Sequence, residues 1–213
     1  MSTRGWAGTT LADRRSERRR RLLDVGLELL GAQGSSAVTV RSVCRTAQLT
    51  DRYFYENFSD RDALVAAVYD EVAYEAGQVL IDAVAGAADP SDAVVARAAV
   101  DGFLDLITGD PRKGRVLLLE PLTDQVLGAR SVALSPAFAR IISAQLESAD
   151  GVAAELTATA IVGAMANLFI RWLDGSLAID RAELADYCVR LLVAAMALAA
   201  PPAPRPRPPA PRR

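Results

Sequence analysis

The sequence predicts an all-α protein with a small N-terminal helical domain and a larger one after it. Apolar residues recur at helical spacing, capping residues begin these segments, and strand-like alternation with hairpin turns is not seen. With 213 residues, 51% of them hydrophobic, the chain can bury a substantial core. We expect a disordered segment 1–14, a first domain 15–60, a second domain 61–200 and a disordered Pro/Arg-rich tail 201–213.

The first domain contains three predicted helices. The first runs from Arg15 to Gln33, and Gly34 ends it. Thr39 caps a short second helix, whose apolar residues follow the i, i+3, i+4, i+7 rule: Val40, Val43, Cys44 and Ala47. Thr50 caps a third helix, and the short connection between the second and third allows only a tight corner.

The second domain contains the remaining predicted helices. Ser59 and Asp62 form a predicted capping box for a long fourth helix. Further helices are expected over 91–108, 111–119, 123–133, 136–148, 152–174 and 181–200. Asp180 and Glu183 form a second capping box at the start of the last one.

The net charge of -2 conceals an asymmetry along the chain. Up to Phe58 there are ten arginines and six acidic residues, whereas residues 59–204 carry ten basic and 20 acidic residues. The four arginines after Pro204 belong either to an inert extension or to a second DNA-binding arm. A basic N-terminal domain before an acidic body indicates that the first domain binds a polyanion such as DNA.

The third predicted helix separates apolar from polar side chains. Phe54 and Phe58 lie one helical turn apart and are predicted to pack inward on Val43 and the first helix. The polar residues after Thr50 remain for the outer and flanking faces. A helix-turn-helix reads the major groove with a short helix that is held by apolar side chains and carries polar side chains on its outer face. Residues 39–58 are therefore predicted to form a helix-turn-helix.

The segment Thr39–Val68 also resembles the N-terminal domain of the TetR family of transcriptional regulators. Several elements of the family pattern occur in order: the Thr-capped second helix, the cap at Thr50, the aromatic pair Phe54-Tyr55, Phe58, and a charged start of helix four ending at Leu64. The resemblance implies an all-α DNA-binding domain followed by a helical ligand-binding and dimerisation domain.

The same resemblance assigns DNA contacts to individual residues. Thr39 and Arg41 match phosphate or base contacts, and three residues at the start of the third helix match base-reading positions. Tyr55 and Arg61 match phosphate contacts, roles for which both side chains are chemically suited. The full set of predicted DNA-binding residues is Thr39, Arg41, Thr50, Asp51, Arg52, Tyr53, Tyr55, Asn57 and Arg61.

Three positions leave alternatives open. Gln48 replaces a glycine of the family pattern, so it either adopts positive φ or the turn relaxes. Asn57 replaces a common histidine, and Asp51 either accepts from a cytosine amine or only favours the helix N-terminus. The arginines of 18–21 either contact the DNA backbone or form a solvated helix start.

The body is expected to hold a dimer interface and a ligand pocket. The helices 152–174 and 181–200 mix small and large apolar residues, which suits either a homodimer interface with a symmetry mate or an intrachain core. The predicted ligand-binding residues are Phe103, Glu120, Met165, Asn167 and Arg171. Alternatively, Arg171 pairs with Asp174 or Glu120 as a structural ion pair.

These features predict a homodimeric regulator, a repressor that a small-molecule effector releases from a pseudo-palindromic DNA operator. A constitutive or architectural DNA-binding dimer without a ligand is the alternative. An all-α enzyme is disfavoured because the chain has no histidine, no phosphate-cradling Gly-rich loop and no metal-ligand spacing, so neither cofactor nor metal is expected. The apolar run 191–204 is too short to span a bilayer and the start lacks a secretory signal, so a cytoplasmic protein without membrane contact is expected.

Overall fold

The computed structural model describes residues 11–89, 91–146 and 151–199, which are helical and contain no strand. The head comprises α1 (Leu11–Gln33), a 3₁₀ turn η1 (Ser35–Ala37), α2 (Val40–Ala47) and α3 (Asp51–Tyr55). The body comprises α4 (Arg61–Ala85), α5 (Asp92–Gly109), α6 (Pro111–Gly114), a π-helical turn η2 (Arg115–Leu119), a 3₁₀ turn η3 (Glu120–Leu122), α7 (Gln125–Ser143), α8 (Gly151–Leu173) and α9 (Arg181–Ala199). The all-α prediction is confirmed.

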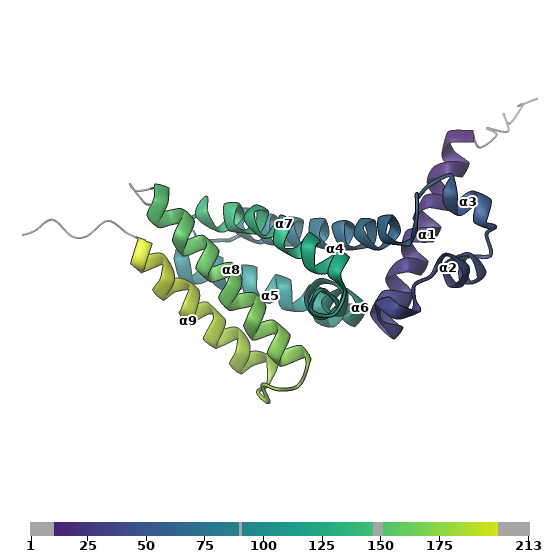
Figure 1. Cartoon of the computed structure of the whole chain (residues 1–213). Coiled ribbons are helices and arrows are strands. Elements are labelled where there is room, and N and C mark those ends of the chain that lie inside the picture. Colours follow the sequence, from purple (N-terminus) through teal and green to yellow (C-terminus); the bar gives the residue numbers. More distant parts are fainter. Residues whose placement is uncertain (1–10, 90, 147–150, 200–213) are drawn as a thin grey trace, which may run out of the picture.

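The head lies at one end of the molecule, and α4 runs from it along the length of the body (Figure 1). Its core is made by apolar faces of α1, α2 and α3. Leu22, Leu30, Val43 and Phe54 have no solvent-exposed surface. The short helices α2 and α3 thus pack on the longer α1, which supports both.

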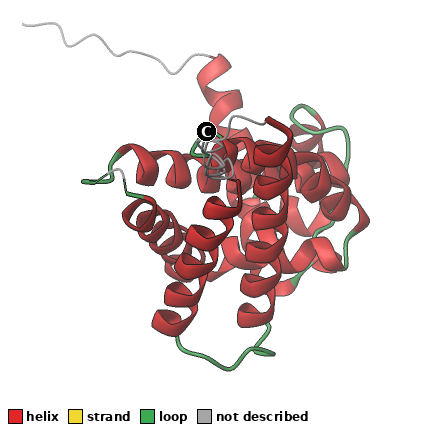
Figure 2. Ribbon diagram, turned by 90° about the vertical axis from the view of Figure 1, so that its left-hand side faces the viewer, coloured by secondary structure: helices red, strands yellow, loops and turns green. Residues whose placement is uncertain are grey.

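The body is a bundle of long helices in which α4 packs against α5 and α7. α9 packs on α5 and α8, and α8 also contacts α7. Helices joined by loops make up the described part of the chain, without a strand (Figure 2). Buried leucines and aromatic residues fill the centre, where the rings of Phe103 and Phe169 stack with centroids 4.9 Å apart. This arrangement surrounds a space between α4, α5, α7 and α8.

The observed boundaries correct several predicted ones. α1 begins at Leu11, so residues 11–14 are helical, while 1–10 and 201–213 lie outside the described residues. The N-cap of α4 is Asp60 rather than Ser59, and its carboxylate accepts from the Ala63 N–H at 2.8 Å. The predicted capping box at Asp180 and Glu183 is confirmed by two reciprocal hydrogen bonds of 2.8 and 3.2 Å.

Two predicted helices on either side of Pro136 form one continuous helix, α7. A proline inside a helix removes one backbone hydrogen bond and was read in the sequence as a helix start. Here the packing of α7 against α4 and α8 maintains the helix through that position. Conversely, the predicted helix 111–119 changes from α-helical to π-helical geometry at Arg115.

By length and composition alone, two of the described helices, α7 and α8, are apolar enough to cross a membrane. In the folded chain, side chains from both line the space inside the body. Part of their apolar character is therefore accounted for by the interior of the bundle.

Candidate functional site

Local structure fixes both ends of α2. The Thr39 hydroxyl accepts from the Ser42 N–H at 3.0 Å, and the Ser42 hydroxyl accepts from the Thr39 N–H at 2.9 Å, which begins α2. Gln48 ends α2 in the left-handed conformation, with φ 55° and ψ 41°. The residue that replaces the expected glycine therefore holds positive φ rather than relaxing the turn, a strained choice for a residue with a Cβ.

Arginines of α1 hold the C-terminal end of α3. The Arg15 guanidinium donates to the Glu56 carbonyl at 2.7 Å, and that of Arg19 donates to the Asn57 carbonyl at 3.1 Å. Arg18 lies over the Tyr53 ring, 4.6 Å from its centroid. Cations at a helix C-terminus satisfy its free carbonyls and oppose the negative end of its dipole.

The outer surface of α2 and α3 carries cationic and aromatic side chains. The Arg52 side chain is 85% exposed and makes an i,i+4 ion pair with Glu56. Tyr53 is 37% and Tyr55 58% exposed, and Arg41 is also exposed. We call these four residues, with Arg45, the reading surface.

Arg45 is an exposed cation that the sequence interpretation missed. It lies four residues after Arg41 on α2, and residues at this spacing share one helix face. That spacing was the available signal.

Several predicted DNA-binding residues are engaged within the protein. Asp51 accepts a hydrogen bond from the Cys44 thiol, whose pKa is raised to about 11, mainly by burial and further by this carboxylate. The Asn57 amide donates to the Tyr53 carbonyl at 2.8 Å. Thr50 is exposed and makes no side-chain capping bond. Local structure therefore explains Asp51 and Asn57 without a DNA contact.

Arg61 lies at the boundary between head and body rather than on the reading surface. Its guanidinium donates to the Ser35 carbonyl at 2.9 Å, the Val38 carbonyl at 3.3 Å and the Asp124 carboxylate at 2.8 Å. Burial raises the pKa of Asp124, but hydrogen bonds from Arg61 and the Leu127 N–H outweigh it and leave that pKa below its usual value. The predicted phosphate-binding cation is thus largely committed to an internal ion pair.

Glu120 is buried at the same boundary, with 4% of its surface exposed. Its carboxylate accepts from the Ser35 N–H at 2.8 Å and from the Arg115 guanidinium at 2.8 Å. Ser35 is therefore held through its N–H by Glu120 and through its carbonyl by Arg61. We call Ser35, Arg61, Arg115, Glu120 and Asp124 the junction.

Two glycines allow this close contact between head and body. A Cβ on Gly31 would lie 2.6 Å from the Cα of Arg112 in α6, closer than real Cβ atoms approach a backbone atom. Gly34 has φ 86°, and its Cβ would come within 3.2 Å of the Arg115 guanidinium. Glycine is required at the first position by space and at the second by backbone conformation.

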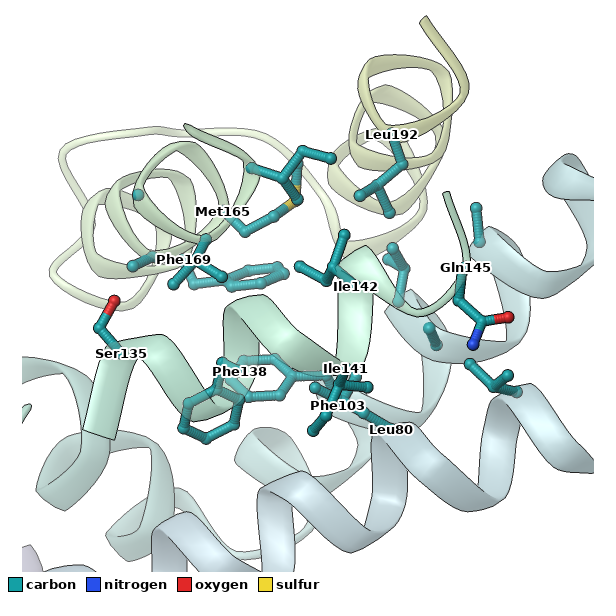
Figure 3. A pocket seen from close by; sticks show the side chains of 18 of the residues that line it. Leu80, Phe103, Ser135, Phe138, Ile141, Ile142, Gln145, Met165, Phe169 and Leu192 are labelled. Carbon is teal, nitrogen blue, oxygen red and sulfur yellow. The ribbon is translucent and has the colours of Figure 1, made fainter. Parts of the chain in front are cut away.

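The body contains a cavity of about 280 Å³ between α4, α5, α7, α8 and α9. Its lining is apolar apart from the polar groups of Tyr69, Ser131, Ser135 and Gln145. Figure 3 shows Ser135 and Gln145 among the apolar side chains. Burial raises the pKa of Tyr69, and a side-chain hydrogen bond with Ser131 opposes that rise in part. Leu117 and Leu118 of the π-helical turn line the cavity. The same turn begins at the junction residue Arg115 and is followed by Glu120.

Residues 22–68 match the family model of bacterial regulatory proteins, tetR family. The match includes α2, α3 and the beginning of α4, so this part of the chain is similar to the DNA-binding domain of the TetR family. The head therefore contains a TetR-type DNA-binding helix-turn-helix, as its sequence predicts. No curated protein matches the chain in sequence.

Solved structures of bacterial regulators share the fold of most of the chain. A TetR-like transcriptional regulator from Rhodococcus sp. RHA1 is 23% identical, with a TM-score of 0.60 over 84% of this chain and 96% of that one. The fatty acid degradation regulator FadR from Bacillus halodurans is 13% identical, with a TM-score of 0.68 over 90% and 97%. FadR from Bacillus subtilis, solved in complex with stearoyl-CoA, is 16% identical, with a TM-score of 0.67 over 83% and 98%.

In the body of this chain, the predicted pocket and the observed cavity share only Phe103 and Met165. Asn167 and Arg171 are exposed on the outer face of α8, and Glu120 belongs to the junction. The Arg171 guanidinium lies 3.4 Å from the Ser176 hydroxyl. The sequence predicts pocket groups from polar residues in apolar surroundings. Asn167 and Arg171 instead lie on the side of α8 that faces away from the cavity, and Glu120 binds Ser35, which is distant in sequence.

Proposed function

We propose that the protein is a homodimeric, cytoplasmic repressor that a small apolar effector releases from a pseudo-palindromic operator. Two reading surfaces would enter successive major grooves, about 34 Å apart. The observation that carries the proposal is the head itself, in which buried Val43, Phe54 and Phe58 support exposed Arg52 and Tyr53. An arginine can bind guanine bidentately, and a tyrosine hydroxyl can donate to a phosphate.

The experiment selects genomic fragments retained by the purified protein and measures operator affinity by fluorescence anisotropy. The double variant Arg52→Ala/Tyr53→Ala is expected to lose at least tenfold in affinity, because each residue faces the groove. The matched control Arg140→Ala/Tyr74→Ala removes the same residue types from exposed positions of the body and should bind normally. Equal affinity of the reading-surface variant and the wild type would refute the assignment.

The proposed dimer interface lies on α8 and α9. On these helices Leu156 is 67%, Val152 63% and Tyr187 49% exposed. Large apolar side chains exposed to water in a single chain are typical of a surface that another chain covers. We expect Leu156→Glu/Tyr187→Glu to be monomeric by sedimentation and to bind the operator weakly. Val132→Glu, at a 76% exposed position of α7, is the control that should remain dimeric. A dimeric interface variant would reject this surface.

The cavity and the junction together suggest how an effector acts on the head. A ligand against Leu117 and Leu118 displaces the π-helical turn, and Arg115 and Glu120 transmit the displacement to Ser35. Ser35 connects α1 to α2, so the reading surfaces of the dimer change their spacing. The effector must bind the released geometry more tightly than the operator-bound one, since otherwise it shifts no population.

The presence of a cavity favours this ligand-controlled regulator over a constitutive DNA-binding dimer. The constitutive alternative predicts that operator affinity is the same with and without any cavity ligand. An enzymatic role is not part of the proposal, because the family is one of DNA-binding regulators. One structural neighbour is a fatty acid degradation regulator and another was solved in complex with stearoyl-CoA, so molecules with an aliphatic chain are the first effectors to test.

A further inference from the structure

We infer that the effector is an uncharged, elongated apolar molecule of about ten carbon atoms with a hydrogen-bonding terminal group, and that carboxylates and amines are rejected. The inference rests on the proposed function, because it concerns the ligand of the same cavity. It follows from the charge, size and shape of the lining.

The first argument is charge. Within the part of the chain that the structure describes, the cavity lining contains no Asp, Glu, Lys or Arg side chain. An ion placed inside would lose its hydration without gaining a counter-ion, which is strongly unfavourable in an apolar interior. A carboxylate or ammonium ligand would have to keep its charged group outside the cavity or bind in its neutral form. A neutral group carries neither cost.

The second argument is size. An engineered cavity of about 150 Å³ holds one benzene ring, or about 25 Å³ for each non-hydrogen atom. The 280 Å³ cavity therefore accommodates about eleven such atoms at the same density. A stearoyl chain exceeds this capacity, so the ligand seen with the Bacillus subtilis regulator would not fit wholly inside.

The third argument is the position of the polar groups. Ser135 and Gln145 lie at opposite ends of the labelled side chains in Figure 3, with Phe138, Ile141 and Ile142 between them. From Ser135, α7 continues to Ser143, a rise of about 12 Å, and Gln145 lies in the turn that follows. The site is therefore an apolar channel with a hydrogen-bonding group near each end, which suits an extended molecule with a terminal hydroxyl, amide or carbonyl.

The experiment compares four probes with the same chain length: 1-decanol, decanoate, decylammonium and decanoyl-CoA. Dissociation constants are measured by calorimetry on the full chain without DNA, at neutral pH and below micelle-forming concentrations. We expect 1-decanol to bind at least tenfold more tightly than each of the other three. Absence of 1-decanol binding, or equal or tighter binding of any charged probe, overturns the inference.

A pair of adjacent variants tests whether binding occurs in this cavity. Gln145→Lys places a cation at one end of the channel and is expected to raise decanoate affinity at least tenfold while lowering decylammonium affinity. Ala144→Lys adds the same charge at an exposed neighbouring position that does not line the cavity, and should leave the order of the probes unchanged. Identical behaviour of the two variants overturns the assignment of the probe to the channel.

Operator release is measured separately, so that the two proposals can fail independently. If 1-decanol binds selectively but leaves operator affinity unchanged, the ligand class stands and the proposed release function is refuted. If decanoate releases the operator more effectively than 1-decanol, the proposed function stands and the neutral-ligand inference is refuted.

Discussion

Replacing Gly31 with alanine tests the close contact between head and body. The new Cβ would lie 2.6 Å from the Cα of Arg112, whereas nonbonded carbon atoms are at their optimum about 3.5–4.0 Å apart. The obstacle is backbone, so no side-chain rotation removes it, and α1 and α6 must separate by about 1 Å. The substitution therefore perturbs the contact between head and body through which we propose that the effector acts on the head.

The expected magnitude is the difference between two opposing effects. Overpacking a close helix contact costs about 1–3 kcal/mol, whereas glycine to alanine inside a helix gains about 1 kcal/mol in propensity. A net loss of about 1 kcal/mol lowers the melting temperature of a chain of this size by about 2–4 °C. We also expect the effector to change operator affinity less in the variant, because the junction is displaced.

Differential scanning calorimetry at one fixed protein concentration checks the stability, and anisotropy titrations with and without effector check the coupling. Gly109→Ala is the control, because a Cβ there meets no atom within 4 Å. Its melting temperature should equal or exceed that of the wild type. If Gly31→Ala also melts as high as the wild type and retains full effector response, the steric reasoning is wrong.

Three further substitutions probe the head and the junction. Arg52→Ala should weaken operator binding by about 1–3 kcal/mol in anisotropy titrations while leaving the melting temperature unchanged, since the side chain is 85% exposed; a large drop in melting temperature would contradict this. Phe54→Ala should lower the free energy of unfolding in urea by about 3–5 kcal/mol, because the ring is fully buried, and a loss below 1 kcal/mol would show that the head does not depend on it. Asp124 has a pKa below its usual 3.8, so its charged form stabilises the fold above that pH and this contribution is lost as the pH falls through the lower folded-state value. In Asp124→Asn the melting temperature should therefore fall less steeply between pH 5 and acid than in the wild type, and parallel profiles would contradict the assignment.

Features governed by neighbours in sequence could be predicted. The caps of α2 and α9 and the buried Phe54 each depend on residues within a few positions of one another. In such cases a residue type and its spacing determine the contact. For Gln48 the sequence left positive φ and a relaxed turn open, and the structure shows the first. Arg45 was missed, although it lies one helical turn after Arg41 and its spacing was a local signal of the same kind.

Contacts between distant parts of the chain could not be predicted. Glu120 meets Ser35 across 85 positions, and Arg61 meets Asp124 across 63. From sequence, Arg61 matched a phosphate contact and Glu120 a pocket group. Both interpretations were chemically reasonable, because a charged side chain needs a partner and the sequence does not show which one is near.

The composition of α8 carries information of a different kind. A helix with apolar side chains around most of its circumference is stable when other apolar groups cover those side chains. Its composition does not show whether the same chain or a second chain covers them. Here Ile161 and Phe169 face the core and cavity, whereas Leu156 and Val152 remain exposed in the single chain. Intrachain packing therefore explains one face of α8 and leaves the other exposed. If that face binds a second copy of the chain, as we propose, the same helix joins the effector cavity to the dimer interface.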